Sequence, residues 1–183
     1  MFIQTEQTPN PATLKFLPGR DVVPHGVVDF VDRDQAQVSP LARRVFEVEG
    51  VTGVFLGADF VTVTKAAGED WYALKPAVLG AIMEHFMSGE PAVEPDGAVD
   101  DGAPDDEDEL AKQIRELIDT RVRPAVAQDG GDIIFRGFER GVVYLHMRGA
   151  CSGCPSATIT LKNGIENLLK YYVPEVVEVR PVV

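Results

Sequence analysis

An acidic segment near the middle of the chain limits what the sequence can fold into. Residues 88–109 hold ten of the 29 Asp and Glu residues, three prolines and no aromatic or basic residue. Such a segment cannot bury enough apolar surface to fold, and its like charges repel one another. We therefore predict a flexible acidic linker over residues 88–106, with a docking site for a basic partner as the alternative. The linker would join two separate domains, residues 1–87 and 107–183.

The first 87 residues alternate short apolar runs with turn residues. Ser39 and Pro40 predict a helix start, because serine caps helices and proline suits the first helical position. A second helix is predicted from about Pro76, with Trp71 before it in the core. Strands, helix, hairpin and helix in this order predict an α+β sandwich. The predicted strands are Phe2–Thr5, Ala12–Phe16, Val27–Phe30, Val51–Leu56 and Phe60–Lys65.

The C-terminal part predicts a second, smaller domain of order α-β-β-α-β. We expect Pro124 to end its first helix and Arg140-Gly141 to form a tight turn between two strands. A domain this small is only marginally stable on its core alone. The whole chain is thus predicted to be α+β, with two small α/β sandwich domains joined by a flexible acidic linker. The predicted elements are Asp106–Arg123, Asp132–Phe138, Val142–Met147, a helix from Pro155 and Glu175–Arg180.

Composition and charge exclude several functional classes. The formal net charge is −12, and no basic patch suggests nucleic-acid binding. No apolar run approaches the roughly 18 residues that a membrane span needs. The segment MFIQTEQTPNP has neither the basic region nor the following apolar region of a signal peptide, so we expect an untargeted or already processed chain. The expected location is the cytoplasm of a bacterium, or an organelle matrix if the chain is a processed form.

The chain's two cysteines, Cys151 and Cys154, lie in the segment GACSGCPSA. A CxxC in a chain without a signal peptide is more often metal-binding or redox-active than structural. The motif is predicted to lie between a strand and the start of a helix, where the helix dipole favours thiolate. Gly149 and Gly153 allow the turns that would point both sulfurs the same way.

The CxxC spacing alone leaves several readings open. A thioredoxin-like redox pair would need this placement between strand and helix, but the surrounding domain does not match. A structural zinc site wants four ligands, and one chain offers Cys151, Cys154 and His146 at most. An iron–sulfur cluster usually has four thiolates, so two chains would have to share one cluster. An incidental CxxC is the remaining alternative.

Few other side chains suggest a site. His146 is interpreted as a half-exposed strand residue rather than a ligand, and Arg148 as solvated, although it could balance the charge of a cluster. Asp129 and Asp132 flank a Gly-Gly turn, which predicts capping or turn roles, with hydrogen bonding near the cysteine loop as the alternative. Histidines without a cysteine or acid at ligand spacing are treated as surface residues: His25 and His85.

Two parts of the chain resemble one protein family. The C-terminal part resembles the C-terminal domain of NifU-like (Nfu) iron–sulfur cluster proteins in DGGDIIF and GVVYLHMRGACSGCPSATITLKNGIENLL. The N-terminal part resembles the N-terminal domain of the same family in QTPNPATLKFLPG, FVTVTK and W..LKP. The resemblance implies a scaffold or carrier rather than an enzyme. It implies that a homodimer binds one [4Fe–4S] cluster, or alternatively [2Fe–2S], through Cys151 and Cys154 of both subunits.

The same resemblance implies partners. The cluster would be transferred to apo iron–sulfur client proteins, and other cluster-assembly factors would also bind. The protein would be a homodimer when loaded and a monomer when apo, and the N-terminal domain would recognise targets. A CxxC thiol–disulfide oxidoreductase is the alternative function. Metal and sulfide content after anaerobic purification would discriminate the two.

Overall fold

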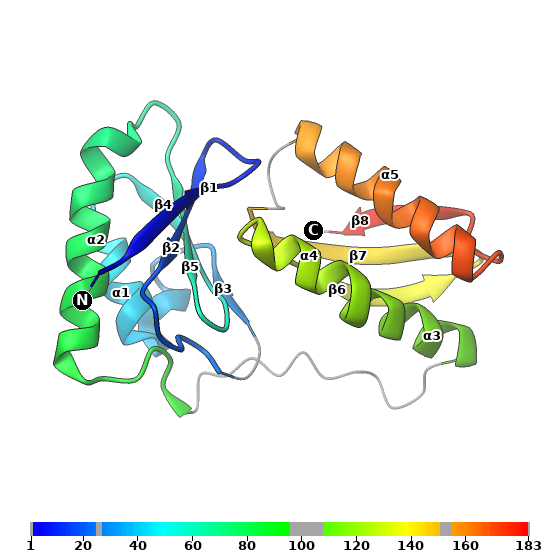
Figure 1. The fold of residues 1–183 in the computed structure, drawn as a ribbon, viewed down its shortest axis with the longest axis horizontal. Helices are drawn as coiled ribbons and strands as arrows, with labels where there is room; N and C mark the ends of the chain where they lie inside the picture. Colours follow the sequence, from blue (N-terminus) through cyan, green and yellow to red (C-terminus); the bar gives the residue numbers. More distant parts are fainter. Residues whose placement is uncertain (1, 25–26, 96–107, 151–154, 183) are drawn as a thin grey trace. The chain divides into compact units, whose positions relative to one another are not determined.

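The chain consists of two compact units, residues 1–100 and 101–183 (Figure 1). Both units combine helices with β-strands, so the predicted α+β fold class is confirmed. No described helix is both long and apolar enough to cross a membrane. The computed structural model describes residues 2–24, 27–95, 108–150 and 155–182, with the backbone alone for residues 155–158.

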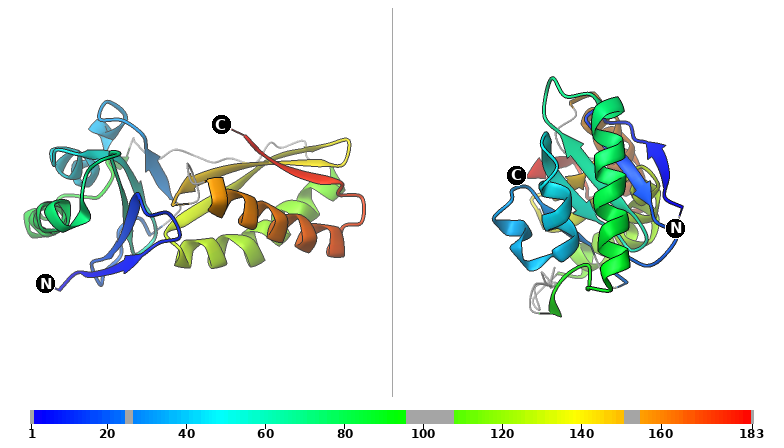
Figure 2. Two further views of the ribbon diagram at one scale, coloured as in Figure 1. Left: turned by 90° about the horizontal axis from the view of Figure 1, so that it is seen from above. Right: turned by 90° about the vertical axis from the view of Figure 1, so that its left-hand side faces the viewer.

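The first unit is a five-stranded sheet with two helices against one face (Figure 1, Figure 2). Its elements are β1 (Gln4–Gln7), β2 (Thr13–Leu17), β3 (Val28–Phe30), a 3₁₀ turn (Gln35–Val38), α1 (Pro40–Phe46), β4 (Val51–Leu56), β5 (Val61–Lys65) and α2 (Trp71–Ser88). The strand order is β1-β2-β5-β4-β3, and all neighbouring pairs are antiparallel. The core packs sheet residues such as Phe16 and Leu56 with Leu41 of α1 and Ile82 of α2.

Most elements of the first unit follow from local sequence signals. The predicted strands are confirmed to within two residues, and β4 has the predicted bounds. The Oγ atom of Ser39 accepts a hydrogen bond from the N–H of Ala42 at 3.0 Å, and Pro40 occupies the first helical position. The predicted start of α1 is therefore confirmed together with its cap.

Helix α2 begins five residues before the predicted start at Pro76. Asp70 caps it, because its Oδ1 atom accepts a hydrogen bond from the N–H of Tyr72 at 2.9 Å. This cap overrides the preference of proline for the first position. Trp71 is only half-buried, with its ring 6.4 Å from that of Phe16, so the prediction of a core residue holds in part.

The chain after α2 stays in contact with the first unit through residue 94. Gly89 ends the helix in the left-handed conformation, with φ at 76°. The Oγ atom of Ser39 donates to the carbonyl oxygen of Ala92 at 2.5 Å, and the N–H of Glu94 donates to the carbonyl oxygen of Val38 at 2.8 Å. The first part of the predicted linker is thus hydrogen-bonded to Val38 and Ser39, the two residues that precede α1.

The second unit is a three-stranded sheet with all of its helices on one face (Figure 2). Its elements are α3 (Glu109–Leu117), a π-turn (Ile118–Val122), α4 (Arg123–Gln128), β6 (Gly131–Glu139), β7 (Val142–Gly149), α5 (Pro155–Tyr172) and β8 (Glu178–Val182). The strand order is β6-β7-β8, with β6 antiparallel and β8 parallel to β7. The core lies between sheet and helices, with Ile118, Ile133, Leu145 and Leu169 fully buried.

Pro124 does not end the first helix of this unit, contrary to our prediction. The helix passes through the π-turn Ile118–Val122 and continues to Gln128. Proline lacks an N–H and collides with the carbonyl group four residues earlier in a regular helix. The wider π-turn, in which the N–H of Arg123 donates to the carbonyl oxygen of Ile118, lies immediately before Pro124 and relaxes this conflict.

The hairpin β6–β7 closes through the predicted tight turn. Arg140 and Gly141 both have positive φ, 52° and 80°, which is the type I′ geometry of two-residue hairpins. A Cβ atom at position 141 would lie 2.7 Å from Cγ2 of Val177, so any other residue would force Val177 to shift and would strain the backbone. The strand β7 extends two residues beyond the predicted end, to Gly149, and β8 begins three residues later than predicted.

Candidate metal-binding site at the CxxC motif

Residues 151–154, which include Cys151 and Cys154, lie outside the described residues, and the structure describes both flanks. Strand β7 ends at Gly149 and helix α5 begins at Pro155. The motif therefore connects a strand end to a helix N-terminus, as the sequence predicted. The role of the two cysteines as ligands stays a prediction.

The chain entering the motif is bonded to the turn before β6. Gly131 lies opposite Gly149 in the β6–β7 register, and the N–H of Ala150 donates to the carbonyl oxygen of Gly130 at 3.2 Å. Gly130 and Gly149 both have positive φ, 80° and 62°. The last described residues before the motif, Gly149 and Ala150, are thus held by a glycine-rich frame of backbone contacts with Gly130 and Gly131.

An ion pair lies beside this frame. Arg123, the first residue of α4, donates from Nε and Nη2 to the two carboxylate oxygens of Asp132 in β6, at 2.9 and 2.8 Å. Its Nη1 atom reaches Asp119 at 3.4 Å. The hydrogen bond to Asp132 is the main cause that raises the pKa of Arg123, against the effect of burial. Arg123 therefore stays charged and presents a fixed fork to β6.

The predicted turn role of Asp132 is wrong, whereas Asp129 is the C-cap of α4 as predicted. Asp132 belongs to β6 because the strand begins at Gly131, and its side chain is only 4% exposed. Sequence reasoning missed Arg123 altogether. An acid placed beside the apolar residues of a predicted strand was the available signal, because a buried carboxylate requires a partner.

Two residues of β7, His146 and Arg148, precede the CxxC motif. His146 is half-buried, with Nη2 of Arg136 at 3.3 Å from its Nδ1 atom, so the predicted half-exposed strand residue is confirmed. Arg148 is 8% exposed, so the prediction of a solvated side chain is wrong. The physical reason is that β7 continues to Gly149 and places Arg148 in the sheet, opposite Asp132. Among the described residues, no group of His, Cys, Asp or Glu could hold a metal ion.

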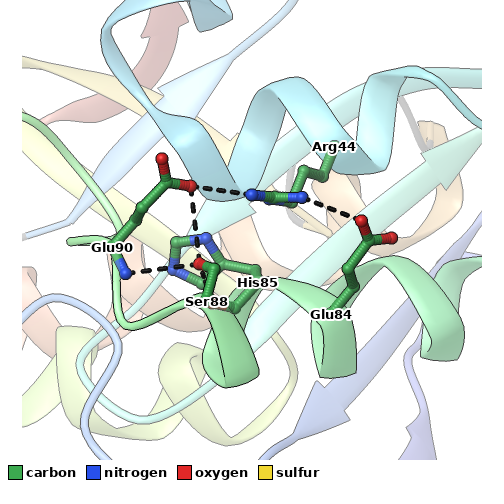
Figure 3. Close-up of polar contacts among 5 residues, drawn as sticks. All are labelled: Arg44, Glu84, His85, Ser88 and Glu90. Atoms are coloured by element: carbon green, nitrogen blue, oxygen red, sulfur yellow. Dashed lines mark hydrogen bonds and ion pairs between the residues drawn. The ribbon is translucent and has the colours of Figure 1, made fainter.

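A second polar cluster lies in the first unit, around the end of α2 (Figure 3). Arg44 of α1 pairs with Glu84 of α2 at 3.1 Å and with Glu90 at 2.7 Å. The hydroxyl of Ser88 donates to the carbonyl oxygen of His85 at 2.6 Å and accepts from the N–H of Glu90 at 3.3 Å. These contacts hold the end of α2 and the following residues against α1.

His85 is buried at the centre of this cluster and is only 1% exposed, so its prediction as a surface residue is wrong (Figure 3). It lies on the core face of α2 with Val78 and Ile82, a placement that ligand spacing could not reveal. Neither ring nitrogen has a hydrogen-bond partner among the described residues. Burial lowers the pKa of His85, and the charge of Arg44 acts in the same direction. His25 lies outside the described residues.

Comparison with known proteins finds two family matches, one in each unit. The family described as "Scaffold protein Nfu/NifU N terminal" matches residues 3–89, and the family described as "NifU-like domain" matches residues 114–180. The second match includes both cysteines.

Whole-chain relatives are also found. An "NFU1 iron-sulfur cluster scaffold homolog, mitochondrial" from Drosophila erecta is 52% identical and covers 100% of this chain, which spans 65% of the relative. The protein of the same name from Homo sapiens is 50% identical over 96% of this chain and 70% of its own length. The chain thus spans about two thirds of the curated relatives that it matches. A solution structure of a NifU-like protein from Saccharomyces cerevisiae is 27% identical, with a TM-score of 0.43, over 52% of this chain and 86% of its own.

Proposed function

Because the chain belongs to the Nfu/NifU family of iron–sulfur cluster scaffold proteins, we propose that Cys151 and Cys154 of two subunits bind one [4Fe–4S] cluster. The chain then passes the cluster to apo-proteins. One observation carries the proposal: the only two cysteines form a CxxC between the end of β7 and the start of α5. Helix N-termini favour thiolate, and thiolate is the form that binds iron.

The number of cysteines explains why the site is shared. A [4Fe–4S] cluster is usually held by four thiolates, and one chain supplies two. Two chains related by a two-fold axis supply four. Because each half-site is incomplete alone, cluster binding and dimer formation are one event, and the apo chain has no equivalent reason to dimerise.

A shared site also suits delivery. The cluster is cargo, so it must be held until a client arrives and must then leave. Separation of the two subunits exposes two of the four ligand positions to incoming client thiolates. Apo iron–sulfur proteins and other cluster-assembly factors are the proposed partners. The unit of residues 1–100 is proposed to recognise them, and tethering raises the effective concentration of the cluster near a bound client.

The location of the protein is part of the same proposal. The relatives named above are mitochondrial by name, which is consistent with an organelle matrix. They give no support to the bacterial cytoplasm, the first of the two expected locations.

Anaerobic reconstitution with ferrous iron and sulfide tests the function. The expected product is a coloured dimer with about four irons and four sulfides per pair of chains. Metal and sulfide analysis and the mass in solution measure this directly. A colourless monomer that reduces insulin disulfides would overturn the carrier in favour of a thiol–disulfide oxidoreductase, and two irons per dimer would replace [4Fe–4S] by [2Fe–2S].

A further inference from the structure

We propose that the ion pair of Arg123 and Asp132, called the clamp below, positions the CxxC loop for cluster binding. The inference rests on the proposed function and goes beyond it, because it assigns a role to two residues that are not ligands. Neither residue needs to touch the cluster. Both act through the chain that leads into Cys151, so they are positioning residues.

The clamp fixes one end of α4 to β6. The guanidinium of Arg123 makes two parallel hydrogen bonds to the carboxylate of Asp132, at 2.9 and 2.8 Å. A bidentate pair of this kind fixes the plane and direction of both groups, which a single bond does not. The contact of Arg123 with Asp119, four residues earlier, restrains the same side chain from its own helix. The second residue of β6 is therefore fixed relative to the helix.

The π-turn explains how Arg123 comes to face β6. A π-turn adds one residue to a helical turn. Because successive residues of an α-helix are separated by about 100°, the added residue rotates everything after it by roughly that angle. The turn Ile118–Val122 ends immediately before Arg123. In an uninterrupted helix the side chain would point in another direction, so the irregular turn and the clamp belong together.

The position of Asp132 is passed to the cysteine motif by the sheet. Asp132 lies opposite Arg148, and Gly131 lies opposite Gly149. The N–H of Ala150 donates to the carbonyl oxygen of Gly130. Residues 148–150, the last three before Cys151, are thus each matched with one of residues 130–132. A shift of Asp132 moves the strand that delivers the first cysteine.

The frame needs this support because it is built from glycine. Gly130, Gly131 and Gly149 have no side chain that could pack and fix the backbone. A functional site must hold its groups to within about 0.5 Å, which requires support from surrounding residues. The clamp is a charged, directional contact to the strand residue next to these glycines, and it supplies the orientation that they cannot.

The experiment compares cluster retention in matched variants of the full chain. Asp132→Asn keeps the size of the side chain and removes its charge, and Arg123→Lys keeps the charge and removes the fork. Each is reconstituted anaerobically, and loss of the cluster to a chelator is timed at a temperature where the protein is folded. Gly141→Ala is the control, because it disturbs the same hairpin at the opposite turn.

We expect both clamp variants to lose the cluster about tenfold faster than wild type, in line with the 10–100-fold cost of disturbing residues that support metal ligands. The double variant Arg123→Lys/Asp132→Asn should lose it no faster than the worse of its two single variants, because each residue acts through the other. Gly141→Ala should lower the thermal midpoint and leave the loss rate unchanged. Clamp variants that retain the cluster like wild type would overturn the inference. The inference would also be overturned if the rate of cluster loss rose as the thermal midpoint fell in the same way for all variants, Gly141→Ala included.

A second measurement needs no cluster. The alkylation rate of Cys151 and Cys154 by iodoacetamide, in the folded apo chain, reports their surroundings. We expect Asp132→Asn and Arg123→Lys to change this rate and Gly141→Ala to leave it unchanged. If wild type takes up no cluster, the proposed function fails, and this rate still decides whether the clamp positions the loop. Identical rates in all variants would then refute the clamp.

Discussion

The helices of the two units begin in different ways. In the first unit, Ser39 caps α1 through Ala42 and Asp70 caps α2 through Tyr72, contacts that span two or three residues. In the second unit, the described starts of α3 and α4 have no side-chain cap. There α4 begins instead with an ion pair, from Arg123 to Asp132 nine residues later. Ion pairs over longer distances along the chain also occur in the first unit, from Arg44 to Glu84 and Glu90, but they lie around the end of α2.

The consequences of these contacts for stability and for the site differ between the units. A short-range cap stabilises the start of its own helix, and Ser39 in addition donates to the carbonyl oxygen of Ala92 after α2. In the second unit the ion pair reaches Asp132 of β6, which lies opposite Arg148 of β7, the strand that leads to the cysteines. Under the proposal above, a change at this pair alters the site as well as the stability of the unit. The first unit has no cysteine, and it holds the only tryptophan, Trp71, whose fluorescence reports its unfolding separately.

Substitution of either cysteine is expected to affect the second unit alone. Cys151→Ala or Cys154→Ala alone should abolish cluster binding, because each removes two of the four thiolates from a dimer. The unfolding transition reported by Trp71 should not change. Iron and sulfide analysis after anaerobic reconstitution measures the first effect. A stable cluster in either single variant would show that other residues are ligands.

A smaller effect is expected at the turn opposite the cysteines. Gly141→Ala should lower the free energy of unfolding of the second unit by about 1–2 kcal/mol through the left-handed backbone alone, and the clash with Val177 adds to this. Hydrogen exchange of the β6–β7 amides measures it. Unchanged protection of these amides would contradict the turn geometry, and a lower Trp71 transition would show that the units do not unfold separately.

The first unit should respond to pH through His85. Its pKa is lowered in the folded state by burial, so the unfolded chain binds the proton more readily. Stability is therefore complete above the unfolded pKa of about 6.5 and is lost as the pH falls towards the lowered folded value, by up to roughly 1.4 kcal/mol per pH unit. Denaturation monitored by Trp71 fluorescence measures this loss of stability. A range of about pH 8 to 5 brackets the unfolded pKa of about 6.5.

Substitution of the same residue tests the assignment. His85→Leu should flatten the pH dependence, whereas His146→Gln, a change at a half-exposed histidine of the second unit, should leave it intact. An unchanged slope in His85→Leu would assign the dependence to other groups.

Local signals made much of this fold predictable. Ser39-Pro40, Arg140-Gly141 and the bounds of β4 were correct because each depends on backbone preferences of a few residues. The CxxC was placed between a strand and a helix for the same reason, since Pro155 marks the helix start. Its ligand role came from the family resemblance, and the spacing alone did not provide it.

The errors have two causes. Pro124 is accommodated by a π-turn, which is local but too rare for residue preferences to predict. Asp132 pairs with an arginine of another element and His85 faces the core, so both outcomes depend on what the fold places next to the residue. The clamp could be suspected from the buried position of an acid, but its partner could be found only in the fold.

A gain of about 0.5 kcal/mol in stability is expected at the β6–β7 turn. Arg140 adopts a φ of 52°, which asparagine tolerates better than arginine does, and Asn-Gly is the favoured pair in a type I′ turn. Arg140→Asn should therefore raise the free energy of unfolding of this unit by about 0.5 kcal/mol. Chemical denaturation monitored by hydrogen exchange of the amides of this unit detects the gain in the free energy of unfolding. Because this turn lies at the end of the hairpin away from Gly149, the same variant should lose its cluster at the wild-type rate. Slower loss would mean that stability of the unit, rather than the contacts around Asp132, limits how long the cluster is held.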